Sequence, residues 1–131
     1  MTSIMKHIIH VDNSGFFRKQ MKVFLQSEGF MVEGFDSALE ANMTIAAGGA
    51  DMIIVGLAFA GIEGEEFVNK IVSTFSGPVI VISSSVDKVK EERLLALGVH
   101  AAINKSISWK ESLRPYLAEL RGSSLPSGRG R

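Results

Sequence analysis

Five short segments of the chain have the apolar pattern of β-strands. Met52–Val55 and Val79–Ile82 are continuously apolar and rich in β-branched side chains, which is typical of strands covered on both faces. His7–Val11 has the same character, Met31–Phe35 shows it more weakly, and Ala101–Ile103 is a short fifth candidate. We therefore predict five strands, with intervals between them that are long enough to hold helices.

Between the predicted strands, apolar residues recur at helical spacing, which predicts a helix in each interval. The first predicted helix should end at Gly29, the second just before Gly48 and the fourth at Gly98, because glycine commonly follows the last helical turn. Two capping-box sequences, Ser37–Glu40 and Ser108–Glu111, should open the second and fifth helices by binding free backbone N–H groups. The apolar residues that mark the first, third, fourth and fifth helices are Phe16, Phe17, Met21, Phe24 and Leu25, then Phe67, Ile71 and Val72, then Val89, Leu94, Leu95 and Leu97, and finally Trp109, Leu113, Tyr116, Leu117 and Leu120.

The strict alternation of strand and helix predicts an α/β fold built on a parallel sheet. Parallel strands need right-handed crossover connections, which place helices on both faces of the sheet. In such folds, functional sites form at the carboxyl ends of the strands, near the point where the strand order reverses. Candidate functional residues are therefore those that directly follow each predicted strand.

Length and composition indicate one ordinary globular domain. The chain has 131 residues, of which 46% are hydrophobic and 21% are charged. Residues 1–120 hold all fourteen acidic residues and eleven of the fourteen basic ones, a net charge of −3, and Arg121, Arg129 and Arg131 supply the remaining bases. We expect a folded domain over residues 1–120 and a disordered basic tail or linker over 121–131, because that segment is rich in Gly and Ser.

Nothing in the sequence predicts a membrane segment or a secretory signal. The longest apolar stretch, Met52 to Ile62, is too short to span a bilayer, and no charged-then-apolar pattern begins the chain. The balanced charge gives no sign of nucleic acid or a membrane as a partner. The chain has no cysteine, which excludes disulfides and thiolate metal sites. We expect a cytoplasmic protein.

The residues that follow the strands carry a family resemblance. Asp12 and Asn13 follow the first strand, Gly56 the third, Ser83 the fourth and Lys105 the fifth. With this order and spacing, residues 6–120 resemble the CheY-like receiver domain of bacterial response regulators. That family has an acidic pair, an aspartate nucleophile, a Thr or Ser, and a Lys at these strand ends. Its next loop often reads Leu-x-Met-Pro-Gly-Met-Asp-Gly, and this chain has Leu57-Ala-Phe-Ala-Gly-Ile-Glu-Gly64.

The resemblance implies a flavodoxin-like, doubly wound fold. Five parallel strands would lie in the order 2-1-3-4-5, with two helices on one face of the sheet and three on the other. In a receiver of the usual kind, the aspartate nucleophile accepts a phosphoryl group, Mg²⁺ is held by the acidic pair and the nucleophile, and the Lys stabilises the phosphate.

This chain departs from the family at the residues that perform the chemistry. Gly56, at the position of the nucleophile, can neither accept a phosphoryl group nor bind a metal. Asn13 replaces the second acid, so that Asp12 is the one carboxylate left and specific Mg²⁺ binding should be very weak. Ala102 stands where the family has the aromatic residue that reports phosphorylation. We therefore expect no bound metal, no cofactor and no phosphorylation at this site.

Two further expectations concern the charged and polar residues near these strand ends. Lys105 and Asp12 should approach each other across the space left by Gly56, because an unpaired buried charge is costly and each is the other's obvious partner. Ser83 stands where the family has its Thr or Ser, but it is equally well explained as a small residue at a strand end. His10, in a strand covered on both sides, should be a hydrogen-bonded core histidine.

We interpret the chain as a pseudo-receiver, a signalling module that acts by phosphorylation-independent protein–protein interaction. Its partner would be a kinase, an output protein or a second copy of itself in a homodimer. The resemblance favours the surface of the fourth helix, fifth strand and fifth helix. A second interpretation is that Trp109 and Tyr116, the two aromatic residues of this surface, cover the core and do not anchor a partner. The candidate surface residues are Lys88, Glu91, Glu92, Leu95, Ala102, Trp109 and Tyr116.

The sequence leaves two alternative functions open. One is a phosphorelay receiver with a non-standard phosphoacceptor. Asp51 is near Gly56 in sequence but begins the third strand, about 16 Å from its other end at roughly 3.3 Å per residue. The other is a flavodoxin-like enzyme, which is disfavoured because no glycine-rich phosphate loop, nucleophile elbow or metal-ligand cluster is present. Direct nucleic-acid binding is disfavoured by the net charge of −3 over residues 1–120.

Overall fold

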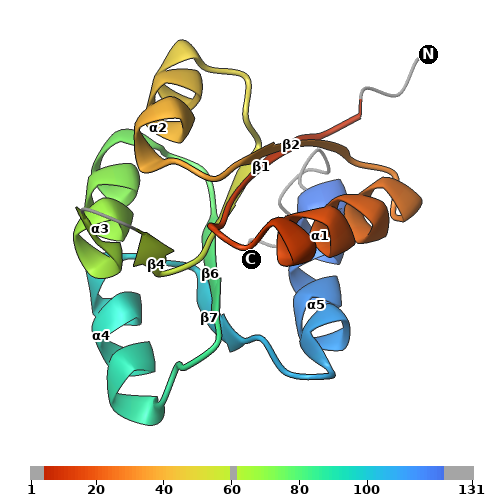
Figure 1. Ribbon diagram of the computed structural model, residues 1–131. Coiled ribbons are helices and arrows are strands. Elements are labelled where there is room, and N and C mark those ends of the chain that lie inside the picture. The colour runs from red at the N-terminus through yellow and green to blue at the C-terminus, as the bar shows by residue number, and fades with distance from the viewer. Residues whose placement is uncertain (1–4, 60–61, 123–131) are drawn as a thin grey trace.

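A five-stranded parallel sheet forms the centre of the fold in the computed structural model, which describes residues 5–59 and 62–122 (Figure 1). The strand order β2-β1-β3-β6-β7 corresponds to the predicted order 2-1-3-4-5, and every pairing between neighbouring strands of this sheet is parallel. The fold prediction is therefore confirmed. The strands are β1 His7–Val11, β2 Met31–Phe35, β3 Met52–Val55, β6 Val79–Ser83 and β7 Ala101–Asn104.

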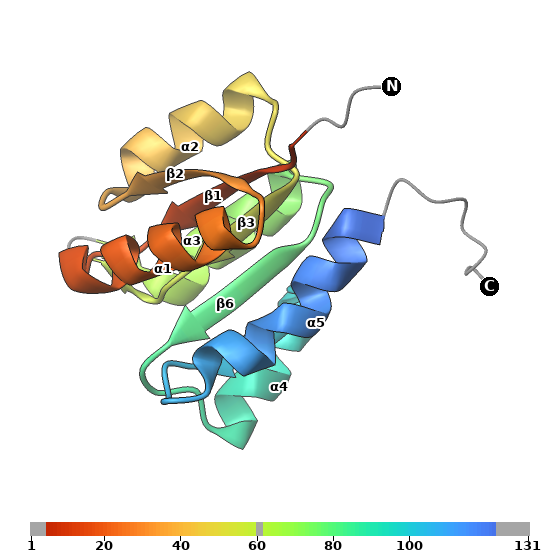
Figure 2. The same ribbon diagram turned by 90° about the vertical axis from the view of Figure 1, so that its right-hand side faces the viewer.

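Helices cover both faces of the sheet, two on one side and three on the other (Figures 1 and 2). The helices α1 (Gly15–Ser27) and α5 (Trp109–Arg121) lie on one face. On the opposite face lie α2 (Ala38–Ala47), α3 (Gly64–Thr74) and α4 (Lys88–Leu97). None of the helices in the described part of the chain is long and apolar enough to cross a membrane.

The central strand β3 shows why its sequence contains no polar position. Successive side chains of a strand point to opposite faces of the sheet. Met52 and Ile54 accordingly pack under α1 and α5, whereas Ile53 and Val55 pack under the other three helices. Both faces of the strand are buried, so a continuous apolar run replaces the usual alternation.

Most helix ends agree with their sequence signals. Gly29 and Gly98, which follow α1 and α4, have φ angles of 93° and 115°, in the region that favours glycine. The Ser37 hydroxyl accepts the Glu40 N–H at the start of α2, as predicted. The corresponding prediction for Ser108 is wrong, because its side chain makes no capping bond. The last helix, α5, extends through Arg121, and the rest of the expected tail, residues 123–131, lies outside the described residues.

A small hairpin that the sequence did not predict follows β3. Its strands, β4 (Ala58–Phe59) and β5 (Ile62–Glu63), pair antiparallel in a sheet of their own, so the parallel sheet is not interrupted. A Cβ atom on Gly64, directly after β5, would overlap the backbone of Leu57. Only glycine therefore fits where the chain turns from this hairpin into α3.

Candidate functional site

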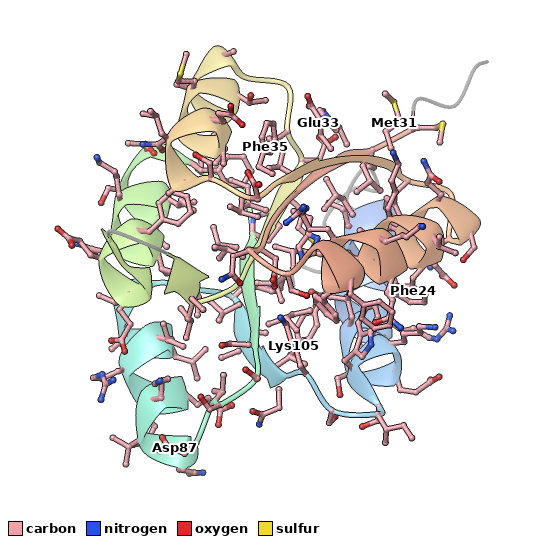
Figure 3. The ribbon with its side chains drawn as sticks, in the orientation of Figure 1. Phe24, Met31, Glu33, Phe35, Asp87 and Lys105 are labelled. Atoms are coloured by element: carbon pink, nitrogen blue, oxygen red, sulfur yellow. The ribbon has the colours of Figure 1, made fainter. Side chains whose placement is uncertain are left out.

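The predicted site residues come together at one end of the sheet, where β1, β3, β6 and β7 have their carboxyl ends. We call this end the carboxyl edge and the opposite end the amino edge. Asp12 directly follows β1, Gly56 follows β3, Ser83 ends β6 and Lys105 follows β7. Lys105 lies between the end of β7 and α1 (Figure 3). Because the strands are parallel neighbours, four distant parts of the sequence supply one site.

Asp12 and Lys105 form an ion pair at the centre of this site. The Lys105 Nζ lies 3.0 Å from Oδ2 of Asp12 and hydrogen-bonds its Oδ1 at 3.3 Å. The side chain of Asp12 is 2% exposed and that of Lys105 is 22% exposed. The ammonium also lies 4.4 Å from the centroid of the Phe17 ring, a cation–π distance. The predicted approach of Lys105 and Asp12 is thus confirmed, and the aromatic ring on the other side of the ammonium is an addition to it.

The carboxylate of Asp12 occupies the space that a side chain at position 56 would need. A Cβ atom added to Gly56 would lie 2.8 Å from Oδ2 and 3.3 Å from Cγ of Asp12. Both distances are too short for an undisturbed contact. The Gly56 N–H is bonded to the carbonyl of Val11, which fixes the two strand ends relative to each other. The carboxylate and Gly56 are therefore packed against each other, with no room for a further group.

Backbone contacts hold Asp12 in this orientation. Its Oδ1 accepts the Ser14 N–H at 2.8 Å, and the Ser14 hydroxyl in turn caps α1 by accepting the Phe17 N–H. The Arg18 guanidinium donates to the backbone carbonyl of Asp12 at 2.7 Å. Phe17 and Arg18 are site residues that the sequence did not predict. The available signal was the start of α1 at Gly15, three residues after Asp12, which brings the first helical turn close to the end of β1.

His10 is buried beside the ion pair and differs from its prediction. Its side chain is 1% exposed, and neither ring nitrogen has a hydrogen-bond partner among the described residues. Nε2 lies 4.0 Å from Oδ2 of Asp12, which is too far for a hydrogen bond. The pKa of the imidazole is lowered from 6.5 to about 4, chiefly by burial; the Asp12 carboxylate opposes this change, and the cations of Lys105 and Arg18 add to it. His10 is therefore a neutral core residue, but the expected hydrogen bond is absent.

The other two predicted pocket residues contribute little to this cluster. Asn13 is exposed at the start of the loop that leads into α1. Ser83 is 8% exposed, and its backbone carbonyl accepts the N–H of Lys105 at 2.9 Å. With Gly56 in place of an acid and Asp12 bound to Lys105, the residues present do not fit Mg²⁺. No group of three or more potential metal-ligating side chains occurs in the parts of the chain that the structure describes.

Asp51, the carboxylate considered as a substitute phosphoacceptor, lies at the amino edge. It precedes β3, whereas Gly56 follows that strand. Its Oδ2 accepts the backbone N–H of His7, the first residue of β1, at 2.8 Å. The full length of β3 therefore separates Asp51 from Lys105, Ser83 and the rest of the carboxyl edge.

Only some residues of the candidate interaction surface are exposed. Lys88, Glu92 and Leu95 are exposed on α4, and Glu91, Ala102 and Tyr116 are half-buried. Trp109 is 7% exposed and packs edge-on against the rings of Phe17 at 4.9 Å and Phe24 at 5.4 Å. Trp109 is too deeply buried to bind a partner, and it belongs to the core beneath α1 and α5.

Many solved structures match this fold. A receiver domain protein from Methanospirillum hungatei JF-1 matches with a TM-score of 0.80 and 20% identity, over 92% of this chain and 98% of that one. The receiver domain of a putative Luxo repressor protein from Vibrio parahaemolyticus matches with a TM-score of 0.82 and 18% identity, over 93% of this chain and 95% of that one. Chemotaxis protein CheY4 of Vibrio cholerae matches with a TM-score of 0.77 and 23% identity, over 89% of this chain and 99% of that one. Identities this low show the shared fold alone.

Family membership rests on the sequence itself. No curated protein matches the chain. Residues 8–115, however, match the family described as "Response regulator receiver domain", and this range contains Asp12, Gly56, Ser83 and Lys105. The chain therefore belongs to the receiver domains of two-component response regulators.

Proposed function

We propose that this receiver domain signals by binding a protein partner without being phosphorylated, as a pseudo-receiver. The observation that carries the proposal is the packing of the Asp12 carboxylate into the space beside Gly56. In the usual receiver that space belongs to the phosphoaccepting aspartate. Here it holds a buried carboxylate whose charge is already balanced by Lys105. Phosphotransfer to a carboxylate needs an accessible nucleophile, which this arrangement does not provide.

Each component of phosphotransfer is affected. Gly56 offers no nucleophile, and Asp12 is 2% exposed and paired with a cation, which makes it a poor one. Mg²⁺ would have one carboxylate, already bound to Lys105, in place of three. Asp51 is at the amino edge and binds a backbone N–H group. These observations favour binding over a phosphorelay with a substitute acceptor, and they favour binding over enzymatic catalysis.

The partner would contact α4, β7 and the exposed side of α5. A kinase, an output protein or a second copy of the chain remain the candidate partners. The exposed Lys88, Glu92 and Leu95 supply charged and apolar contacts on α4, and the half-buried Tyr116 supplies an aromatic edge on α5. We assign this module to the residues up to Arg121, where α5 ends, and the basic tail or linker to the residues that follow.

The test is an attempt to phosphorylate the whole chain. Incubation with acetyl phosphate and Mg²⁺ should leave its intact mass unchanged, and beryllofluoride should not shift the amide resonances around Gly56. A mass gain of one phosphoryl group that mild base removes would refute the proposal. Mapping the site of that group by peptide mass spectrometry would then identify the acceptor.

A control restores the missing carboxylates. The double variant Asn13→Asp, Gly56→Asp should bind Mg²⁺ at millimolar concentrations, seen as metal-dependent amide shifts at the carboxyl edge. Gly56→Asp alone should phosphorylate poorly, because its side chain must first displace the Asp12 carboxylate and Asn13 still supplies no charge. A double variant that binds no Mg²⁺ would show that the site has been rebuilt beyond these two side chains.

A further inference from the structure

The loop between β6 and α4 connects the carboxyl edge to the proposed partner surface. It begins after Ser83, the last residue of β6, and ends at Asp87, the residue that caps α4. Figure 3 labels Asp87 at the start of that helix. The Oδ1 of Asp87 accepts the Lys90 N–H at 2.8 Å, and its carbonyl accepts the Glu91 N–H at 2.8 Å. The conformation of this loop therefore fixes where the first turn of α4 begins.

Asn104 holds this loop with both ends of its side-chain amide. The Val86 N–H donates to Oδ1 at 2.8 Å, and the Asn104 Nδ2 donates to the Val86 carbonyl at 2.9 Å. Asn104 is the last residue of β7 and pairs in register with Ser83. Two hydrogen bonds to the same residue fix its backbone direction, as a neighbouring strand would. The side chain of Val86 is also buried, at 8% exposure.

A second contact joins α4 to α3. Arg93 on α4 donates to both carboxylate oxygens of Glu65 on α3, from Nη2 at 2.7 Å and from Nε at 3.1 Å. This pair is partly exposed, so it orients the helix more than it stabilises the fold. Neither this contact nor the bonds to Val86 involve Asp12, Lys105 or any other charged group of the carboxyl edge.

We propose that Asn104 acts as a latch that keeps the loop 84–87 and the first turn of α4 in one conformation, whatever happens at the carboxyl edge. A neutral amide bound to a backbone N–H and carbonyl does not respond to a proton, a phosphate or a metal ion. The latch makes the α4 surface permanent in shape. This consequence rests on the proposed function, because a permanent surface suits a module that binds without a chemical trigger.

Amide hydrogen exchange on the whole chain tests the latch. In Asn104→Ala the N–H groups of Lys90 and Glu91, neither of which contacts Asn104, should exchange about tenfold faster, as expected when two hydrogen bonds that restrain their helix start are lost. Those of Ile53 and Ile54 in β3 should stay protected. Acceleration confined to Val86 would overturn the latch, because it would show only the loss of a local bond.

Two further variants keep the test decisive. Asn69→Ala makes the same chemical change on the exposed face of α3 and should leave Lys90 and Glu91 unchanged. Asn104→Asp keeps an acceptor for the Val86 N–H but loses the donor, so it should give a smaller acceleration at the same two amides, and it serves if Asn104→Ala does not fold. No acceleration in Asn104→Asp, or equal acceleration in Asn69→Ala, would contradict the latch. Phosphate uptake by the unmodified chain would refute the proposed function and leave this result untouched.

Discussion

At the carboxyl edge, Asp12 is buried under a lysine and packed against Gly56, whereas at the amino edge Asp51 lines an open groove of about 400 Å³. The two carboxylates stand at opposite ends of the same sheet. Asp12 binds a cation and the start of α1, and Asp51 binds the start of β1. The remaining residues of the amino-edge groove are Lys6, Met52, Ser76, Gly77, Pro78, Gly98, His100, Tyr116, Glu119 and Leu120.

The sheet and its apolar layers can therefore be compared separately from the polar residues at the two edges. The sheet, its two apolar layers and the positions of the strand ends are those of a receiver. At the carboxyl edge, Asp12 is buried and paired with Lys105, and its carboxylate lies where a side chain at position 56 would need space.

The largest expected effect concerns the buried histidine of the carboxyl edge. Because the folded protein binds a proton on His10 less readily than the unfolded chain, its contribution to stability is complete above pH 6.5 and falls as the pH drops. A pKa lowered from 6.5 to about 4 corresponds to a loss of about 3 kcal/mol between those pH values. Urea unfolding at a series of pH values measures this loss, which His10→Leu should remove.

A histidine at the amino edge supplies the matched control. His100 is 47% exposed and pairs with Glu119, which is 66% exposed. His100→Gln should leave the decline in stability between pH 6.5 and pH 4 as steep as in the unmodified protein. If His10→Leu and the unmodified protein lose stability in parallel over this range, the burial of His10 does not control the acid response of the carboxyl edge.

The next effect compares the two aspartates directly. Asp12→Ala leaves Lys105 without its partner and removes the acceptor of the Ser14 N–H, so it should lower the free energy of unfolding by about 2 to 3 kcal/mol. Asp51→Ala removes one hydrogen bond to the His7 N–H and should cost about 1 kcal/mol. Urea unfolding at pH 7 measures both. Equal losses would remove the distinction between the two edges.

The strands could be predicted from the sequence because their signal is local. β1, β2 and β3 have the predicted bounds, and β6 and β7 each extend one residue further. A continuous apolar run requires cover on both faces, so it specifies a central parallel strand with few alternatives. The hairpin β4–β5 escaped prediction because strands of two residues have no periodicity to detect.

The missed side-chain contacts depend on competition between neighbours. Ser108 has the sequence of a helix cap, but its hydroxyl contacts that of Ser106, and the Trp109 N–H donates to the Ser106 carbonyl instead. The lack of a hydrogen-bond partner for His10 among the described residues could not be predicted, because whether a buried ring nitrogen meets a donor or acceptor depends on distances across two strands and a helix. The pairing of Asp12 with Lys105 was predictable, since both residues follow parallel strands at the carboxyl edge and each is the other's obvious partner of opposite charge.

A smaller effect than that of Asp12→Ala tests the close packing at Gly56. Gly56→Ala should destabilise the protein by about 1 to 2 kcal/mol, because the new Cβ atom must push the Asp12 carboxylate away from its present position. Gly15→Ala at the start of α1 is the control. Its new Cβ atom would meet only Arg18 Nη2, at an ordinary 3.5 Å, so the stability should be unchanged or slightly higher. Urea unfolding measures both variants under identical conditions.

A double-mutant cycle then shows whether Asp12 is the cause. Without the carboxylate, the nearest atom to a methyl group at position 56 is the Ile82 carbonyl oxygen at 3.6 Å, an ordinary contact. In the Asp12→Ala background, Gly56→Ala should therefore cost nothing, or stabilise by about 0.5 kcal/mol through the lower entropy of the unfolded chain. The coupling energy between the two positions should be at least about 1 kcal/mol. Additive effects would mean that Asp12 does not fill the space beside Gly56, and the contrast between the two edges would lose its structural basis.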